Sequence, residues 1–206
     1  MDAAVLSVVS IGAALGLGAI SPGPSFILVA RTAVASSRRA GIGAALGMGA
    51  GSLVFAIIAL LGLQTLLTAV PVLWLALKTL GGLYLLWMAY KMFRGARAPL
   101  NLELPGSNGK TMKRAFLTAF TTQISNPKTA LVFSGVFAAL LPPQIGTGML
   151  IAIPLVAMTI DGLWYLFVAF ALSSRGPRNT YLRFKAPLDR LGGTVMAALG
   201  IRLIVK

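Results

Sequence analysis

Two proline-containing breaks interrupt long apolar stretches of this chain, and each break sets polar side chains beside free backbone groups. The first break comprises Ser21, Pro22, Gly23 and Pro24, and the second comprises Ser125, Asn126, Pro127 and Lys128, with Gln123 just before it. The backbone N–H groups that begin a helix attract anions, so a half-helix that starts at a break can hold a carboxylate. One isolated proline is more often a feature of packing, but two breaks beside Ser, Asn and Gln favour a binding site for a small solute.

Asp161 is the next candidate for chemistry, because it lies inside the apolar run 147–172. A charged side chain at the centre of a membrane-spanning helix costs about 2.5–3.5 kcal/mol on insertion scales, so it needs a function or a partner. The carboxyl group could take up and release protons during a transport cycle, or attract the ammonium group of a substrate. Alternatively, it could form a fixed ion pair with Lys78 or Lys128 that locks the helices together.

Two lysines also lie within apolar runs. Lys128 opens the half-helix after the second break and could hold a carboxylate or pair with Asp161. Lys78 lies in the run 72–92, where its long side chain could act in the site or snorkel to the membrane surface. The sequence leaves both alternatives open for Lys78.

The elements that must position these residues are membrane helices. The chain has 206 residues, of which 57% are hydrophobic and 11% are charged, against roughly 45–50% apolar residues in soluble domains. About 20 apolar residues are needed for each spanning helix, so this length allows several crossings and little aqueous domain. We therefore expect a single integral membrane domain over residues 1–206. The first apolar run lacks a basic leader, so it is interpreted as a retained span rather than a cleaved signal.

The basic residues indicate the orientation of the chain. Eighteen Lys and Arg oppose four acids, giving a formal net charge of +14, and most bases fall at 31–39, 91–114 and 175–190. The positive-inside rule places these clusters in the cytoplasm and the uncharged corners at 64–71 and 141–147 on the outer side. Both termini are then predicted to be periplasmic. This topology explains the basic charge without a nucleic-acid partner, and it gives every acid except Asp161 a surface location.

The apolar runs predict an all-α membrane protein with six transmembrane helices. The predicted spans are 3–35 with the first break, about 42–63, 72–92, 113–141 with the second break, 147–172, and 191–205. Repeat 1 covers residues 1–95, a loop follows at 96–110, and repeat 2 covers 111–206. Each half has an odd number of spans, so the halves form an inverted repeat with broken helices 1 and 4. In such folds the transport site lies between the broken helices near the bilayer midplane.

Glycine motifs recur in both halves. Residues 41–43 resemble 146–148, and residues 80–82 resemble 191–193. Within the second span, Gly43, Gly47 and Gly51 have the four-residue spacing that lets helices approach closely. This ladder could serve packing inside the monomer or across a homodimer interface.

The chain has no Cys and no His. Disulfides, thiol redox chemistry, Cys/His zinc sites and histidine-based nucleophilic triads are therefore excluded. No nucleophile stands beside a base, so we expect no enzymatic activity, no cofactor and no metal site.

Several motifs together resemble the LysE/RhtB family of bacterial amino-acid exporters over essentially the whole chain. They are the break at 21–24, Arg38-Arg39-Ala40-Gly41, Leu46-Gly47, Leu77-Lys78, Gly81-Gly82, Tyr84-Leu85, the break at 125–128, and Asp161. The resemblance implies a multi-pass carrier of the bacterial inner membrane that exports amino acids or close derivatives, driven by the proton motive force. Its implied partners are the amino acid, protons and the lipid bilayer. It also implies that both breaks, Lys128 and Asp161 form the functional core.

Two alternatives remain at this stage. The wider superfamily contains exporters of other small solutes and ions, although the lack of Cys argues against a thiol reductant and the lack of Cys and His argues against a soft metal. A non-transporting membrane scaffold would instead use the glycine faces to bind partner helices.

Overall fold

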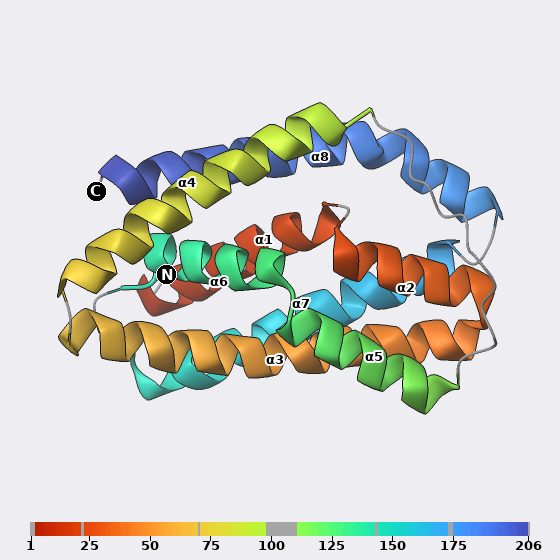
Figure 1. Cartoon of the computed structure of the whole chain (residues 1–206), viewed down its shortest axis with the longest axis horizontal. Coiled ribbons are helices and arrows are strands. Elements are labelled where there is room, and N and C mark those ends of the chain that lie inside the picture. The colour runs from red at the N-terminus through yellow and green to blue at the C-terminus, as the bar shows by residue number, and fades with distance from the viewer. Residues whose placement is uncertain are drawn as a thin grey trace.

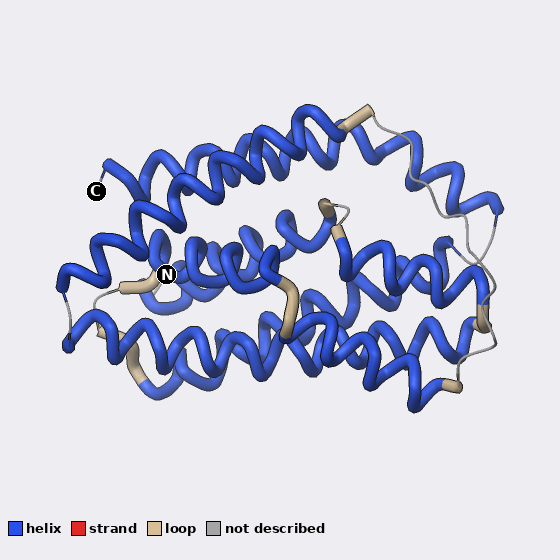
Figure 2. Tube along the Cα trace, in the orientation of Figure 1, coloured by secondary structure: helices blue, strands red, loops and turns tan. Residues whose placement is uncertain are grey.

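The computed structural model describes residues 3–21, 23–69, 71–97, 111–142, 144–172 and 175–205. The residues in these ranges form helices and short connections, without strands, as predicted for an all-α protein (Figures 1 and 2). The helices are α1 (Ala3–Ile20), α2 (Pro24–Ala35), α3 (Arg38–Ala69), α4 (Pro71–Gly95), α5 (Met112–Ile124), α6 (Pro127–Leu140), α7 (Thr147–Leu172) and α8 (Arg175–Val205).

Both predicted helix breaks are present. α1 ends at Ile20 and α2 begins at Pro24, with a bend of 59° between them. α5 ends at Ile124 and α6 begins at Pro127. Proline lacks an N–H and its ring clashes with the preceding turn, so it ends one helix but fits the first position of the next.

The described residues contain two helices that are long and apolar enough to cross a membrane. They are Arg38–Gly62 within α3 and Thr147–Leu172, and the bent pair α1–α2 can count as a third. α6 is apolar but shorter. α8 begins at Arg175, so the basic segment 175–190 that was expected as a connection is helical. The six-span arrangement therefore stays a prediction.

The broken helices lie between two groups of continuous helices (Figure 1). On one side α4 packs along α8, and on the other α3 packs against both α5 and α7. α1 and α6 occupy one half of the space between these groups, and α2 lies toward the other end (Figure 1). Each break is thus surrounded by helices from both halves of the chain.

The glycine ladder of α3 is used inside the monomer. A Cβ on Gly47 would lie 2.3 Å from the carbonyl oxygen of Phe116 in α5, and one on Gly51 would lie 2.7 Å from the Cβ of Gln123. These contacts bring α3 and α5 backbone to backbone, which sets the position of the second break. This contact within the monomer does not require a homodimer, which remains a prediction.

The recurring glycine motifs do not all share a packing role. A Cβ on Gly43 would lie 2.4 Å from the Met112 carbonyl oxygen, whereas Cβ atoms on Gly146 and Gly148 would meet nothing within 4 Å. By contrast, Gly82 and Gly200 face each other between α4 and α8, since a Cβ on Gly200 would lie 2.8 Å from the Gly82 carbonyl oxygen. Similar glycine motifs in the two halves therefore make different packing contacts.

Replacing Gly47 with alanine is expected to destabilise the protein, because the added methyl group overlaps the α5 backbone. Overpacking of this kind costs about 1–3 kcal/mol. The matched control is Gly62→Ala in the same helix, where the new Cβ meets nothing within 4 Å. Thermal unfolding in detergent should show a lower Tm for Gly47→Ala and an unchanged or higher Tm for Gly62→Ala, since alanine favours helix. Equal Tm values for the two variants would contradict this account.

The two ends of the molecule differ in charge. Both chain termini and the facing ends of α3 and α4 lie at one end of the view, and α3 and α5 begin at the other (Figure 1). The first turns of α3 and α5 carry Arg38, Arg39, Lys113 and Arg114. This distribution agrees with the predicted topology, while the side of the membrane on which each end lies remains a prediction.

Candidate functional site

The two helix breaks contact each other directly through hydrogen bonds. Ser25 in the first turn of α2 donates from Oγ to Oε1 of Gln123 at 2.6 Å. Asn126, between α5 and α6, donates from Nδ2 to Oγ of Ser25 at 2.9 Å. All three residues are buried. The breaks are therefore one structural unit, although they lie about a hundred residues apart in the sequence.

Gln123 extends this unit to the buried acid of α7. Its Nε2 donates to Oδ2 of Asp161 and to Oγ of Ser52, in both cases at 2.8 Å. Ser52 of α3 also donates to Oδ2 of Asp161. Asp161 is 4% exposed and lies between Ile160 and Gly162, so hydroxyl and amide donors stabilise its carboxylate instead of water.

The carboxylate oxygens of Asp161 have different surroundings. Both donors, Ser52 and Gln123, bond to Oδ2. No described residue donates a hydrogen bond to Oδ1, and within the same part of the chain Asp161 forms no direct ion pair with Lys128. Of the alternatives open at the sequence level, a locked Asp161–Lys128 pair is therefore not what the structure shows.

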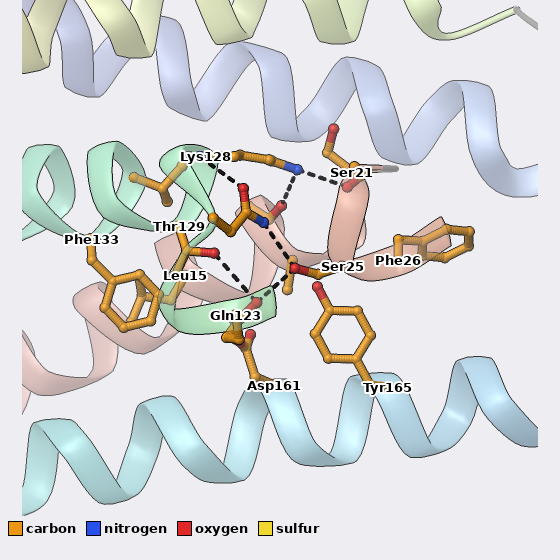
Figure 3. A pocket seen from close by; sticks show the side chains of 15 residues that line it. Leu15, Ser21, Ser25, Phe26, Gln123, Lys128, Thr129, Phe133, Asp161 and Tyr165 are labelled. Carbon is orange, nitrogen blue, oxygen red and sulfur yellow. Dashed lines mark hydrogen bonds between the residues drawn. The ribbon is translucent and has the colours of Figure 1, made fainter. Parts of the chain in front are cut away.

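Lys128 bridges from α6 to the end of α1. Its Nζ donates to the carbonyl oxygens of Ser21 at 2.8 Å and Gly18 at 3.2 Å (Figure 3). The last carbonyls of a helix have no helical partner and carry partial negative charge, which a lysine neutralises. The ammonium group also interacts electrostatically with the carboxylates of Asp189 and Asp161.

Gly23 leaves room for this lysine. A Cβ there would lie 3.0 Å from Cδ and 3.2 Å from Nζ of Lys128. Gly23 is also the residue that precedes α2, and it provides no side-chain cap for that helix. At α6, by contrast, Oδ1 of Asn126 accepts from the N–H of Lys128 at 3.0 Å. The start of α2 is thus the less satisfied of the two half-helix N-termini.

A cavity of about 30 Å³ lies where these groups meet. This volume has room for water-sized molecules and is too small for an amino acid. Polar side chains lie in the middle of the lining, with apolar side chains on both sides of them (Figure 3). The polar lining includes Ser21, Ser25, Gln123, Asn126, Lys128, Asp161 and Tyr165, and the apolar lining includes Leu15, Phe26, Val132 and Phe133.

Comparisons with known proteins identify the family of this chain. A family model described as LysE type translocator matches residues 17–206. The chain belongs to the LysE family. It is therefore a membrane transport protein and not an enzyme, and the resemblance inferred from the motifs is confirmed.

Relatives of known name align with most of the translocator. The translocator is 34% identical over 189 residues to the threonine efflux protein of Escherichia coli K12, an alignment that covers 91% of this chain and 92% of that protein. It is 34% identical over 195 residues to the threonine efflux protein of Salmonella typhimurium, with the same coverage. The leucine efflux protein of Klebsiella pneumoniae is 25% identical over 175 residues, with 85% and 82% coverage. No solved structure matches the chain.

The structure brings together most of the residues predicted for the translocator's site. Cavity-lining positions are Ser21, Gly23, Gln123, Asn126, Lys128 and Asp161. Pro24 and Pro127 begin the half-helices α2 and α6. Ser125, the residue that caps the end of α5, is exposed and does not line the cavity. Pro22 and the side chain of Lys78 lie outside the described residues.

Four polar residues of the site were missed at the sequence level: Ser25, Ser52, Thr129 and Tyr165. Ser25 directly follows the first break and could have been included with it. Ser52 follows the last glycine of the ladder, and Tyr165 lies one helical turn after Asp161. For Ser25, Ser52 and Thr129 the signal is a polar residue directly after a stronger candidate. For Tyr165 it is the spacing of one helical turn.

Proposed function

We propose that this translocator is a secondary active exporter of amino acids or close derivatives across the bacterial inner membrane, coupled to protons. One observation carries the proposal. Where the two broken helices meet, a single cavity is lined by an ammonium group, Lys128, and by a buried carboxylate, Asp161. A free amino acid carries a carboxylate and an ammonium group, which are opposite in charge to Lys128 and Asp161 respectively.

The carboxylate of the substrate has two sources of attraction. Lys128 provides a positive charge, and the first turn of α2 begins at Gly23 without a side-chain cap. Half-helix N-termini of this kind bind substrate carboxylates in other transporter folds. Binding there would compete with the carbonyl oxygens of Ser21 and Gly18 for the lysine ammonium.

Asp161 supports both ammonium binding and proton coupling. Its Oδ2 is held by Ser52 and Gln123, which leaves Oδ1 for either a proton or the substrate ammonium group. Because Oδ1 cannot bind a proton and the ammonium group at the same time, binding of one requires release of the other. Release of the amino acid outside would then be accompanied by proton uptake there and proton release inside, which is antiport.

The proposed architecture has six spans in two inverted three-helix repeats with both termini outside. It is supported by two broken helices that correspond in the two halves, and by basic first turns at the end opposite the chain termini. Alternating access would come from one repeat rocking against the other. Because the cavity holds only about 30 Å³, it must widen for substrate to bind.

A neutral amino acid is the proposed substrate class. Leu15, Phe26 and Phe133 are among the residues that line the cavity, and a short uncharged side chain would fit beside them. Lys128 and Asp161 would already bind the carboxylate and the ammonium group of the amino acid, which leaves no charged lining group for a charged side chain. The efflux proteins named for threonine and leucine are relatives that align over most of this chain, so these two compounds come first in a test.

The test is transport by the purified chain in liposomes. Liposomes loaded with unlabelled threonine or leucine should take up the labelled amino acid by counterflow, and an imposed pH gradient should increase uptake against a concentration gradient. Liposomes without protein are the control, and lysine and glutamate complete the substrate panel. No counterflow with any amino acid would refute the proposed function, whereas counterflow that ignores the pH gradient would refute only proton coupling.

A further inference from the structure

A second buried polar cluster lies on α8, beside the site but outside its cavity. Lys185 is 6% exposed and Asp189 is 2% exposed, and they form an ion pair with Nζ and Oδ2 3.0 Å apart. Both residues were assigned to an exposed basic connection at the sequence level. That assignment was wrong because this segment belongs to α8, where both side chains are buried and Lys185 contacts the end of α4.

The pair fastens the end of α4 to α8. Nζ of Lys185 donates to the carbonyl oxygens of Gly95 at 2.6 Å and Ala96 at 3.3 Å. Gly95 is the last residue of α4, where the helix leaves its acceptors unpaired, and Ala96 directly follows it. One ammonium group thus serves three acceptors: one at the end of α4, one on the residue after it and one on α8. We call this cluster the α4–α8 link.

The α4–α8 link is not fully satisfied. Oδ1 of Asp189 is buried and has no hydrogen-bond partner among the described residues. A buried ion pair pays back its desolvation only when its remaining polar atoms are also bonded. The link therefore holds the helices together less strongly than a network in which every polar atom is hydrogen-bonded. Such a contact costs less to open.

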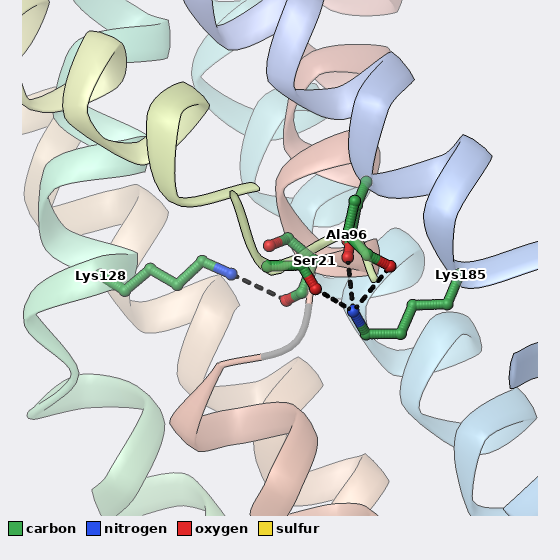
Figure 4. Close-up of polar contacts among 6 residues, drawn as sticks. Ser21, Ala96, Lys128 and Lys185 are labelled. Atoms are coloured by element: carbon green, nitrogen blue, oxygen red, sulfur yellow. Dashed lines mark hydrogen bonds and ion pairs between the residues drawn. The ribbon is translucent and has the colours of Figure 1, made fainter. Parts of the chain in front are cut away.

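The α4–α8 link adjoins the substrate cavity. Figure 4 shows Lys185 from α8 and Lys128 from α6 reaching toward the same place from opposite sides, with Ser21 and Ala96 between them. Lys128 bonds to the Ser21 carbonyl there, and Ser21 lines the cavity. Asp189 also interacts electrostatically with Lys128. Charges of the link and of the site therefore act on each other across the end of α1.

We propose that the α4–α8 link is the cytoplasmic gate of the translocator, closed in this structure and released when the site opens toward the cytoplasm. The inference rests on the proposed function and on its topology, in which 175–190 faces the cytoplasm. Release would separate the end of α4 from α8 beside the first break. The close contact of Gly82 with Gly200, farther along the same helix pair, would hold the two helices together as a pivot.

Thiol labelling from each side of the membrane tests the gate. The natural chain has no Cys, so Ala19→Cys places one thiol in the cavity lining. A membrane-impermeant maleimide reaches it from the cytoplasmic face in inside-out vesicles and from the outer face in right-side-out vesicles. Adding Asp189→Asn should raise the labelling rate in inside-out vesicles about tenfold and leave it unchanged in right-side-out vesicles. Lys185→Gln removes the other partner and should act in the same way.

Two control variants separate gating from general loosening. Arg190→Gln removes an exposed charge next to Asp189 and should label like the parent, and Asp189→Glu keeps the carboxylate and should restore slow labelling. Unchanged rates in both link variants, or an equal rise from both sides, would overturn the gate. The labelling rate can be measured whether or not the protein transports an amino acid. The gate and the proposed function are therefore tested separately, the first by labelling and the second by counterflow with the natural chain.

Discussion

Replacing Asp161 with asparagine is expected to abolish proton-driven export while the protein still inserts and folds. Asparagine fills the same space and can still accept from Ser52 and Gln123 through its carbonyl oxygen. It cannot take up a proton or neutralise an ammonium group. Gradient-driven transport in proteoliposomes should fall by at least about 100-fold, which corresponds to about 2.7 kcal/mol.

The same variant separates the two roles that Asp161 could have. If it only carries protons, counterflow of labelled threonine should survive in Asp161→Asn while the response to a pH gradient is lost. If it also binds the ammonium group, counterflow is lost as well. Thr159→Val is the matched control, because Thr159 lies in the same helix, is exposed, and donates only to the Leu155 carbonyl. Full gradient-driven export by Asp161→Asn would remove Asp161 from the mechanism.

Replacing Lys128 with methionine should have an effect of similar size. Methionine keeps most of the side-chain length but leaves the carbonyl oxygens of Ser21 and Gly18 without their donor. Each hydrogen bond from a charged group contributes about 1.5–3 kcal/mol, and the positive charge that faces the substrate carboxylate is lost too. Counterflow at low substrate concentration should therefore fall by about 100-fold or more.

Arginine is not expected to rescue this position. Gly23 already lies so close to Lys128 that a Cβ would come within 3.0 Å of its Cδ, and the planar guanidinium group is bulkier than an ammonium. Lys113→Met, which removes an exposed base from the first turn of α5, controls for the loss of charge alone. Transport by Lys128→Arg at the natural rate would show that the space beside Gly23 accommodates the larger cation.

The helix breaks show how far local sequence reaches. Pro24 and Pro127 begin α2 and α6 as predicted, because the effect of proline on a helix depends on a few neighbouring residues. The bounds of α7 at 147 and 172 also agree with the predicted span. Its apolar run has no internal charge except Asp161, so length and hydropathy were enough to place it.

The contacts around Asp161 show where local sequence stops. Gln123 was predicted as a neighbour of the second break, but its bonds to Ser25, Ser52 and Asp161 join four helices. Ser52 gave only a weak signal in a glycine-rich run. Its role depends on α3 lying against both α5 and α7, which the close approach at Gly47 and Gly51 makes possible.

The sequence by itself determined that this chain is a helical membrane protein of the LysE family with two broken helices and one central acid. Composition, proline and the family motifs are properties of the chain in order, so they can be read without coordinates. Only the tertiary structure decided that the breaks bond to each other, that Lys128 binds the end of α1 rather than Asp161, and that Lys185 and Asp189 are buried. The direction in which a helix face points depends on which helices pack against it, and that is fixed by contacts between residues far apart in the sequence.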